Sequence, residues 1–244
     1  MSDYRTQVYN RYVTTARGDE RYEQDQRAVD SFLAWCKHKY LPLLEGVKPE
    51  DPILELGCGP GYVLRFLQKE GFVNVEGIDI SEEQLAIAVG QGFNPKLRDV
   101  FEYLPTVENS FNAVIAVDFV EHFTKDELMR LMPLILKSLK KGGTFIVQTP
   151  NGEGLFPGQI MFGDLTHSTI LTPRSLQQLL AISGFTNFRF EETNPTPKNF
   201  VGIIRVILWA GVKFVANFIR KIEAGKTQEI WSENMLCRCE KPDN

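Results

Sequence analysis

The 244-residue sequence has few cysteines, no excess of basic residues and no apolar run at its start. The four cysteines have neither the density of a disulfide scaffold nor the spacing of a zinc site. A net charge of −4 argues against the broad basic surface that nucleic-acid binding needs. Residues 1–13 are polar and lack the apolar core of a secretory signal. We therefore expect a cytoplasmic protein with reduced thiols that does not bind nucleic acid.

The order of apolar and turn-forming residues indicates the domain organisation. From residue 52 onward strands and helices alternate, which predicts an α/β fold with a parallel sheet covered on both faces. We expect a helical cap over residues 1–50 and one domain over 51–244, with a helical insertion at about 193–228. The early tyrosines could contact a ligand, although packing is the commoner role; they are Tyr4, Tyr9 and Tyr12.

The expected strands are 52–56, 73–79, 96–98, 111–117, 144–149, 185–192 and 229–239. Helices are expected to begin near residue 60, after Ser81, after Thr124 and after Thr172, because these three side chains suit an N-cap. Pro133 is expected to kink its helix, and Gly142-Gly143 to end it.

The most informative segment is Ile53-Leu54-Glu55-Leu56-Gly57-Cys58-Gly59-Pro60-Gly61. It predicts a buried strand, a tight turn and a helix start, in which glycines permit positive φ and a close approach of a ligand. The acidic Glu55 disfavours a phosphate ligand and favours a cationic or amine-bearing one. A dinucleotide site would need a third glycine at Tyr62, and a P-loop would need G-K-[ST]. A structural turn without a ligand is the remaining alternative.

The pattern E-x-G-x-G-x-G after a strand resembles the first motif of the class I S-adenosylmethionine (SAM) methyltransferases, and the resemblance covers roughly residues 50–150. It implies a Rossmann-like seven-stranded sheet, mostly parallel with an antiparallel last strand, and SAM as the cofactor. SAM carries sulfonium and ammonium groups. The residues expected to bind it are Glu55, Gly57, Cys58, Gly59, Gly61, Asp79, Ile80, Asp99, Val100, Phe101 and Asp118.

Carboxylates follow the expected strands at the edge where an open parallel sheet binds its ligand. Asp79 could accept hydrogen bonds from ribose hydroxyls, or cap the next helix. Asp99, beside Val100 and Phe101, could accept a hydrogen bond from the adenine amine, or cap a turn. Asp118 follows the fourth strand, where this family places groups that face the substrate.

Two segments that contain a histidine offer candidate catalytic or metal-binding residues, and the first is residues 117–122. The run Val117-Asp118-Phe119-Val120-Glu121-His122 looks like a segment of ubiquinone-type O-methyltransferases, some of which bind a divalent ion. Carried over, Asp118, Glu121 and His122 would be its ligands, but the same residues can cap a helix, and we expect no metal.

Asp164 and His167 lie on the 150–171 connection and resemble a pattern of bacterial methyltransferases that act on sugars or polysaccharide precursors. Histidine suits the removal of a hydroxyl proton near neutral pH, and Asp164 could hold its tautomer. His167 is therefore the expected base, with His122 as the next candidate. The alternative is a histidine that only pins the connection.

We therefore expect methyl transfer to a hydroxyl of a small or lipid-linked molecule. N-methylation of a small molecule and a non-catalytic SAM-binding module are the alternatives, and Tyr62 disfavours an NAD-dependent oxidoreductase. Residues 200–222 predict a basic amphipathic helix, which could be a lid over the pocket, a homodimer contact or a membrane-surface helix. A membrane span is not expected, because Arg205 and Lys213 interrupt its apolar run.

Overall fold

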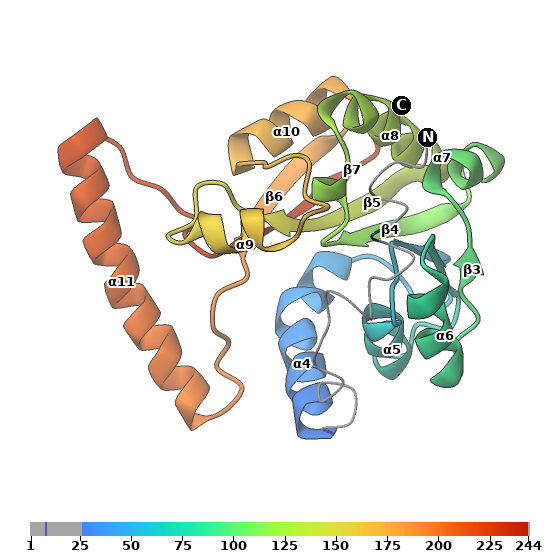
Figure 1. Cartoon of the computed structure of the whole chain (residues 1–244), viewed down its shortest axis with the longest axis horizontal. Coiled ribbons are helices and arrows are strands. Elements are labelled where there is room, and N and C mark those ends of the chain that lie inside the picture. Colours follow the sequence, from blue (N-terminus) through green and yellow to red (C-terminus); the bar gives the residue numbers. More distant parts are fainter. Residues whose placement is uncertain (1–7, 9–25, 244) are drawn as a thin grey trace.

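The computed structural model describes Val8 and residues 26–243 (Figure 1). The three early tyrosines, Tyr4, Tyr9 and Tyr12, lie outside the described residues.

The described chain forms one seven-stranded sheet in the order β3-β2-β1-β4-β5-β7-β6. The pairs from β3 to β5 are parallel, and β7 is antiparallel to both β5 and β6. The strands are β1 (Ile53–Leu56), β2 (Val75–Asp79), β3 (Lys96–Leu97), β4 (Phe111–Val117), β5 (Leu139–Pro150), β6 (Thr186–Glu192) and β7 (Asn234–Glu240). This arrangement confirms the Rossmann-like, seven-stranded methyltransferase sheet.

Helices cover both faces of this sheet (Figure 1). They are α4 (Gln26–Lys39), α5 (Tyr62–Lys69), α6 (Glu82–Gly90), α7 (Val100–Tyr103), α8 (Lys125–Ser138), α9 (Pro157–Gly163), α10 (Pro173–Ile182) and α11 (Phe200–Ala224). Short 3-10 helices are η1 (Leu41–Leu44), η2 (Leu104–Thr106) and η3 (Val120–His122).

The two faces of the sheet build two cores because successive strand residues point to opposite sides. On β4, Ala113 and Ile115 pack with α4 and α5, whereas Val114 and Ala116 pack with α7, α8 and α10. The central strands are apolar on both faces, as expected for parallel strands with helices on either side. The core thereby fixes the ends of β1, β2 and β4 beside one another.

Helix starts follow the expected caps, whereas two boundaries differ from expectation. Thr124 and Thr172 form capping boxes, and the Ser81 side chain accepts a hydrogen bond from the Gln84 backbone N–H. Helix α8 ends at Ser138, before Gly142-Gly143, because β5 already begins at Leu139, which pairs with Phe111.

Strand β7 begins at Asn234, five residues later than the expected 229. The preceding segment is held in an irregular conformation by the side chains of Asn151, directly after β5, and Glu192, at the end of β6. The Asn151 side chain donates to the backbone oxygens of Ile230 and Ser232 at 3.2 and 3.1 Å, and Glu192 accepts from the Trp231 N–H at 2.7 Å.

The helix α11 lies between β6 and β7, within the range expected for an insertion, and stands beside the rest of the domain (Figure 1). Because β6 runs parallel to the central strands, its end leads into α11 at the same edge as the glycine turn after β1.

Candidate active site

The turn after β1 requires glycine for two physical reasons. Gly57, Gly59 and Gly61 have φ values of 67°, 50° and 87°, which side-chain-bearing residues rarely adopt. A Cβ at Gly57 would lie 2.5 Å from the Phe119 ring, and one at Gly59 would lie 2.8 Å from Gln84 Oε1. Larger residues at these positions would therefore strain the backbone or displace neighbouring side chains, so the shape of the turn depends on its glycines.

Glu55 is buried directly before this turn, with 3% of its surface exposed. Burial, and after it the nearby Asp79 carboxylate, raise its pKa well above the usual range, while a hydrogen bond from the Leu64 backbone lowers it. Its Oε2 atom is buried and has no hydrogen-bond partner among the described residues. A ligand ammonium group would offset both the burial and the repulsion from Asp79.

Asp79, at the end of β2, holds the turn in place. Its Oδ2 accepts from the Gly59 N–H at 2.9 Å, and its Oδ1 accepts from the Ser81 N–H at 2.8 Å. A carboxylate oxygen can accept more than one hydrogen bond, so holding the turn is compatible with binding ribose hydroxyls. Ribose binding and helix capping were alternatives in the sequence, and one carboxylate can serve both.

The expected adenine contacts divide into accessible and buried groups. Ile80 is exposed directly after β2, whereas Val100 belongs to the core. Asp99 caps α7, since its Oδ1 accepts from the Phe101 N–H at 2.7 Å. The Phe101 ring packs edge-on against Phe123, with ring centroids 5.8 Å apart. Cys58 is also buried, and burial raises the pKa of its thiol, so it is a small packing residue of the turn.

Asp118 follows β4 with a φ of 48°, a left-handed conformation that is uncommon for a non-glycine residue. Its Oδ1 accepts from Gln148 Nε2 at 3.0 Å, and Gln148 Oε1 accepts from the Tyr40 hydroxyl at 2.8 Å. Sequence reasoning missed this chain of contacts. Its signal is the polar Gln148 within the apolar run of strand β5.

Glu121, His122 and His167 form a cluster between the ends of β4 and β5. One donor atom from each side chain lies within 4.8 Å of the others, and the two imidazole centroids are 5.0 Å apart. The backbone brings them together, because the N–H groups of Ser168 and Thr169 donate to the Glu121 carbonyl oxygen at 2.8 and 3.0 Å. The 150–171 connection is thereby tied to η3.

Thr166 connects Asp164 to His122. The Thr166 hydroxyl donates to Asp164 Oδ1 at 2.6 Å and lies 2.9 Å from His122 Nδ1. His122 Nε2 lies 3.2 Å from the Asp118 carbonyl oxygen. These contacts orient His122, whereas the sequence suggested that Asp164 orients His167.

Burial sets the protonation of this cluster. Glu121 Oε2 accepts from the Thr149 hydroxyl at 3.0 Å, and Oε1 has no partner among the described residues. Burial, followed by the Asp118 charge, raises the pKa of Glu121 well above its usual range. Burial, followed by repulsion from His167, lowers the pKa of His122 to about 4. His122 is therefore neutral at neutral pH, and burial favours the protonated form of Glu121.

The His167 side chain is half-buried, and its Nδ1 has no hydrogen-bond partner among residues 26–243. The Glu121–His122–His167 group could also hold a metal ion by its geometry. It differs from the ligand set considered in the sequence because His167 takes the place of Asp118.

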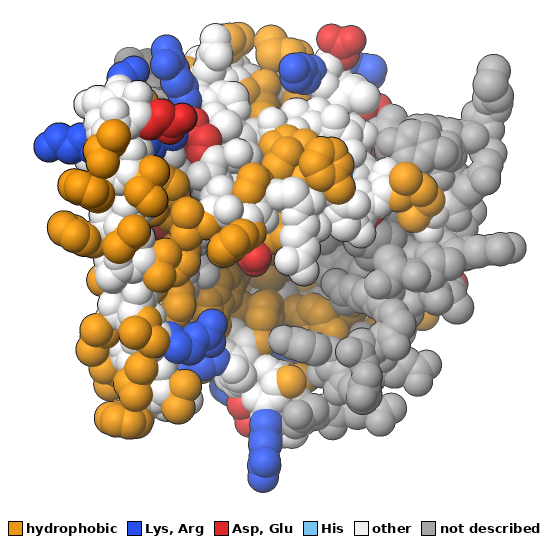
Figure 2. All heavy atoms as spheres, turned by 60° about the vertical axis from the view of Figure 1, so that its left-hand side comes forward, with side chains coloured by type: hydrophobic (Ala, Val, Ile, Leu, Met, Phe, Trp, Pro, Cys, Tyr) orange, Lys and Arg blue, Asp and Glu red, His pale blue; other side chains and the backbone are white. Residues whose placement is uncertain are grey.

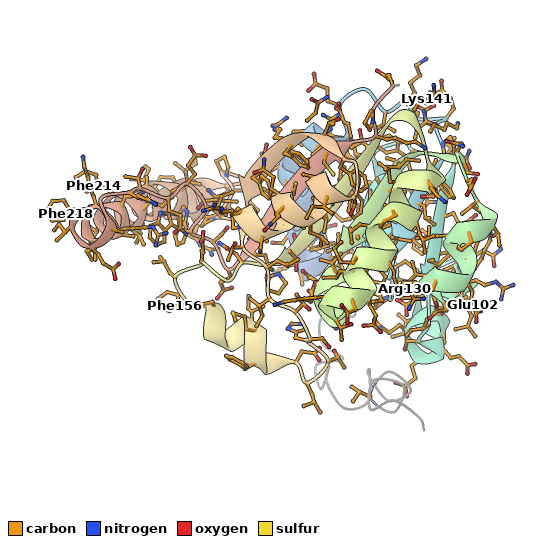
Figure 3. The ribbon with its side chains drawn as sticks, turned by 90° about the horizontal axis from the view of Figure 1, so that it is seen from above. Glu102, Arg130, Lys141, Phe156, Phe214 and Phe218 are labelled. Atoms are coloured by element: carbon orange, nitrogen blue, oxygen red, sulfur yellow. The ribbon has the colours of Figure 1, made fainter. Side chains whose placement is uncertain are left out.

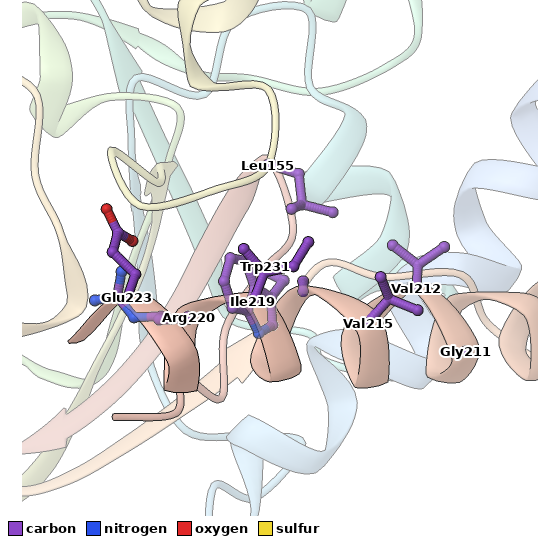
Figure 4. A pocket seen from close by; sticks show the side chains of 9 residues that line it. Leu155, Gly211, Val212, Val215, Ile219, Arg220, Glu223 and Trp231 are labelled. Carbon is purple, nitrogen blue, oxygen red and sulfur yellow. The ribbon is translucent and has the colours of Figure 1, made fainter. Parts of the chain in front are cut away.

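A groove of about 660 Å³ lies between α11 and the segments that follow β5 and precede β7 (Figure 4). Its lining is mainly apolar and includes Leu155, Val212, Val215 and Trp231. Arg220 and Glu223 lie toward one end (Figure 4). Leu155 follows β5 and Trp231 precedes β7, so the groove lies beyond the same edge of the sheet as the histidine cluster.

The chain is similar in sequence to known proteins of one class. Residues 26–189, about two thirds of the chain, match the family described as methyltransferase domain. A stretch of 164 residues is 29% identical to phosphoethanolamine N-methyltransferase 2 of Caenorhabditis elegans and covers 63% of this chain and 37% of that protein. A stretch of 125 residues is 34% identical to a sterol 24-C-methyltransferase of Gibberella zeae and covers 48% of this chain and 32% of that protein.

The chain thus spans about a third of the length of these two curated relatives. Among solved structures, a SAM-dependent methyltransferase from Archaeoglobus fulgidus has the same fold, with a TM-score of 0.66 and 23% identity. The match covers 98% of this chain and 100% of that one.

Proposed function

The chain belongs to the class I SAM-dependent methyltransferases, and we propose that it transfers a methyl group from SAM to a hydroxyl of a small or lipid-linked molecule. The observation that carries the hydroxyl acceptor is His167, whose half-buried imidazole has an Nδ1 without a partner among the described residues. An alcohol releases its proton only far above pH 7, so its attack on a methyl group benefits from a general base nearby.

The residues around the glycine turn fit SAM. Its sulfonium supplies an electrophilic methyl group when the cofactor is bound. In this assignment Asp79, which also accepts hydrogen bonds from the Gly59 and Ser81 N–H groups, binds the ribose hydroxyls, and Glu55 balances the ammonium group. Ile80 offers an exposed apolar surface to the adenine ring. The protein then contributes chiefly by holding the acceptor oxygen in line with the methyl carbon.

The neighbours of His167 suit a base. His122, with a pKa of about 4, is neutral at neutral pH, and the Glu121 carboxyl group carries no positive charge in either protonation state. When His167 takes a proton from the acceptor, neither of these two neighbours repels the positive charge that forms on its ring. Asp164 acts at a distance by fixing Thr166 and, through it, the His122 ring.

N-methylation of a small molecule is the second candidate, and the similarity to a phosphoethanolamine N-methyltransferase supports it. The two reactions place different demands on His167. A neutral amine attacks through a free lone pair, so the loss of the base should cost much less than with a hydroxyl acceptor. A non-catalytic SAM-binding module would form no methylated product with either acceptor class.

The test is His167→Ala, assayed with radiolabelled SAM and a panel of alcohols, phenols, sugars and amines. We expect turnover of the best hydroxyl acceptor to fall roughly 10²–10⁴-fold, while affinity for the demethylated cofactor stays unchanged. The matched control is His38→Ala, which removes an exposed histidine of α4. Near-normal turnover in His167→Ala would reduce His167 to a structural contact of the connection.

A further inference from the structure

Helix α11 exposes most of its large apolar residues. A surface helix of a globular protein normally turns its apolar stripe toward the core and its polar residues toward water. In α11 only Gly202 is fully buried, and the half-buried stripe that faces the domain consists of Val206, Trp209, Lys213, Ala216, Asn217 and Arg220.

Polar contacts attach this inner stripe to the domain. Lys213 Nζ forms an ion pair with Glu192 Oε2 at 2.9 Å and donates to the Glu229 carbonyl oxygen at 2.7 Å. Trp209 Nε1 donates to Glu192 Oε2 at 3.3 Å, and Asn217 Oδ1 accepts from the Gln228 N–H at 2.8 Å. These bonds fix which side of the helix faces outward.

The outward side is almost wholly apolar (Figure 2). Phe214 and Phe218, with 75% and 59% of their surfaces exposed, point away from the domain (Figure 3). The other exposed apolar residues of the helix are Phe200, Val201, Ile203, Ile204, Ile207, Leu208, Val212, Val215, Ile219 and Ile222, of which Val212, Val215 and Ile219 also line the groove. So large a contiguous apolar surface indicates a binding partner.

The net charge of residues 198–226 indicates what kind of partner the apolar surface binds. Residues 198–226 carry six basic residues and one acidic residue, a net charge of +5. Because the whole chain carries −4, the remainder carries −9. An anionic surface would therefore attract this segment and repel the rest of the domain. A second copy of the chain would bring the same cations against each other.

Length and composition would allow α11 to cross a bilayer, contrary to the sequence expectation. The helix has 25 residues, and an 18-residue window has a mean hydropathy of 1.7 with 6% of it buried. Its attachment argues for a different orientation. Lys213 lies near the midpoint of α11 and is bonded to Glu192 at the end of β6. A crossing helix would draw this ion pair and the edge of the sheet into hydrocarbon, which is costly.

We propose that α11 is a membrane-docking helix that lies in the plane of an anionic bilayer. Its apolar outer side enters the boundary between headgroups and acyl chains. Arg205, Lys221 and Lys226 remain at the level of the anionic headgroups. The inner stripe, which is bonded to the domain through Trp209, Lys213 and Asn217, keeps the domain on the aqueous side of the bilayer, so the protein is a peripheral one.

The test is cosedimentation of the purified full chain with vesicles of phosphatidylcholine containing about 30 mol % phosphatidylglycerol, compared with pure phosphatidylcholine. We expect tighter binding to the anionic vesicles, weakened as the salt rises from about 0.1 to about 0.5 M. The double variant Phe214→Ser/Phe218→Ser should lose about tenfold or more of the binding. Lys221→Gln/Lys226→Gln should lose most of the preference for anionic lipid.

The matched control is Val73→Ser/Ile182→Ser, which removes two exposed apolar side chains elsewhere and should bind vesicles as the wild type does. Circular dichroism should show the same helix content in all variants, because the replaced side chains are exposed. Absence of sedimentation with anionic vesicles would overturn the proposal, as would unchanged binding of Phe214→Ser/Phe218→Ser. Light scattering is the check for a dimer. If the wild type is a dimer and Phe214→Ser/Phe218→Ser is a monomer, the apolar surface of α11 binds a second copy of the chain instead of a bilayer.

Discussion

Replacement of Asp79 by alanine tests the cofactor site most directly. The carboxylate accepts backbone hydrogen bonds from Gly59 at 2.9 Å and from Ser81 at 2.8 Å, and in our assignment it also binds the ribose. Hydrogen bonds to a charged group contribute about 1.5–3 kcal/mol. Loss of the ribose contacts should therefore weaken binding of the demethylated cofactor by about 10- to 150-fold.

The same change should loosen the turn, so binding and stability must be measured together. Isothermal titration calorimetry gives the affinity, and urea unfolding gives the free energy of unfolding. The control is Ser81→Ala, which removes the cap of α6 and should cost about 0.5–2 kcal/mol of stability while it leaves the Asp79 carboxylate in place. Its cofactor affinity should stay close to that of the wild type.

The cofactor affinities of Asp79→Ala and Ser81→Ala together show whether the Asp79 carboxylate binds the ribose. If Asp79→Ala binds the cofactor within about twofold of the wild type, the carboxylate contributes less than the energy of one charge-assisted bond, and its assignment to the ribose is refuted. If Ser81→Ala loses as much affinity as Asp79→Ala, the effect belongs to the shape of the turn and not to the carboxylate.

Two further predictions concern the turn and the histidine cluster. Gly59→Val should abolish cofactor binding in calorimetry, because a branched side chain must adopt a φ of 50° and its Cβ would lie 2.8 Å from Gln84 Oε1; binding at wild-type affinity would contradict this. For His122, the pKa falls from 6.5 in the unfolded chain to about 4 in the fold, so stability is lost as the pH falls through that window. His122→Asn should remove this loss, and urea unfolding should show that the wild type loses roughly 3 kcal/mol more than the variant between pH 6.5 and 4.

The sequence predicts those parts of the fold that depend on local patterns. Alternating or continuous apolar runs define the strands, and the glycine turn, Ser81 and Thr124 define where helices begin. Boundaries that depend on distant partners are not predicted. The end of α8 is set by the pairing of Leu139 with Phe111, and the late start of β7 is set by Asn151 and Glu192.

In the site too, the sequence predicts features that depend on local patterns but not contacts between distant residues. Turns and strand ends place Asp79, Asp99 and Asp118 at one edge of the sheet, as the sequence suggests. The contacts that orient the site join residues far apart in the chain. Tyr40 lies 108 positions from Gln148, and Thr166 lies 44 positions from His122. Residue spacing carries no signal for such pairs.

The orientation of helix α11 is a third feature that the sequence does not predict. A helical wheel separates its polar and apolar sides, and the ordinary expectation places the apolar side against the domain. In the structure most of the apolar side faces outward instead, and Lys213 on the inner stripe forms an ion pair with the largely buried Glu192. Arg205 and Lys221, which share the polar side on the wheel, are instead exposed.

The order of the strands limits the size of an acceptor that could use both the histidine cluster and the groove under α11. Strands in a sheet lie about 4.8 Å apart, and β7 is two strands from β4, which precedes Glu121 and His122. An acceptor with its hydroxyl at the cluster and its apolar part in the groove would therefore extend over roughly 10 Å. A single sugar ring or a small amine is too short for this, whereas a lipid-linked molecule is long enough. Val212, Val215 and Ile219 are both exposed on α11 and part of the groove lining, so a bilayer on which α11 lies would border the groove, and a lipid-linked acceptor would be consistent with membrane docking.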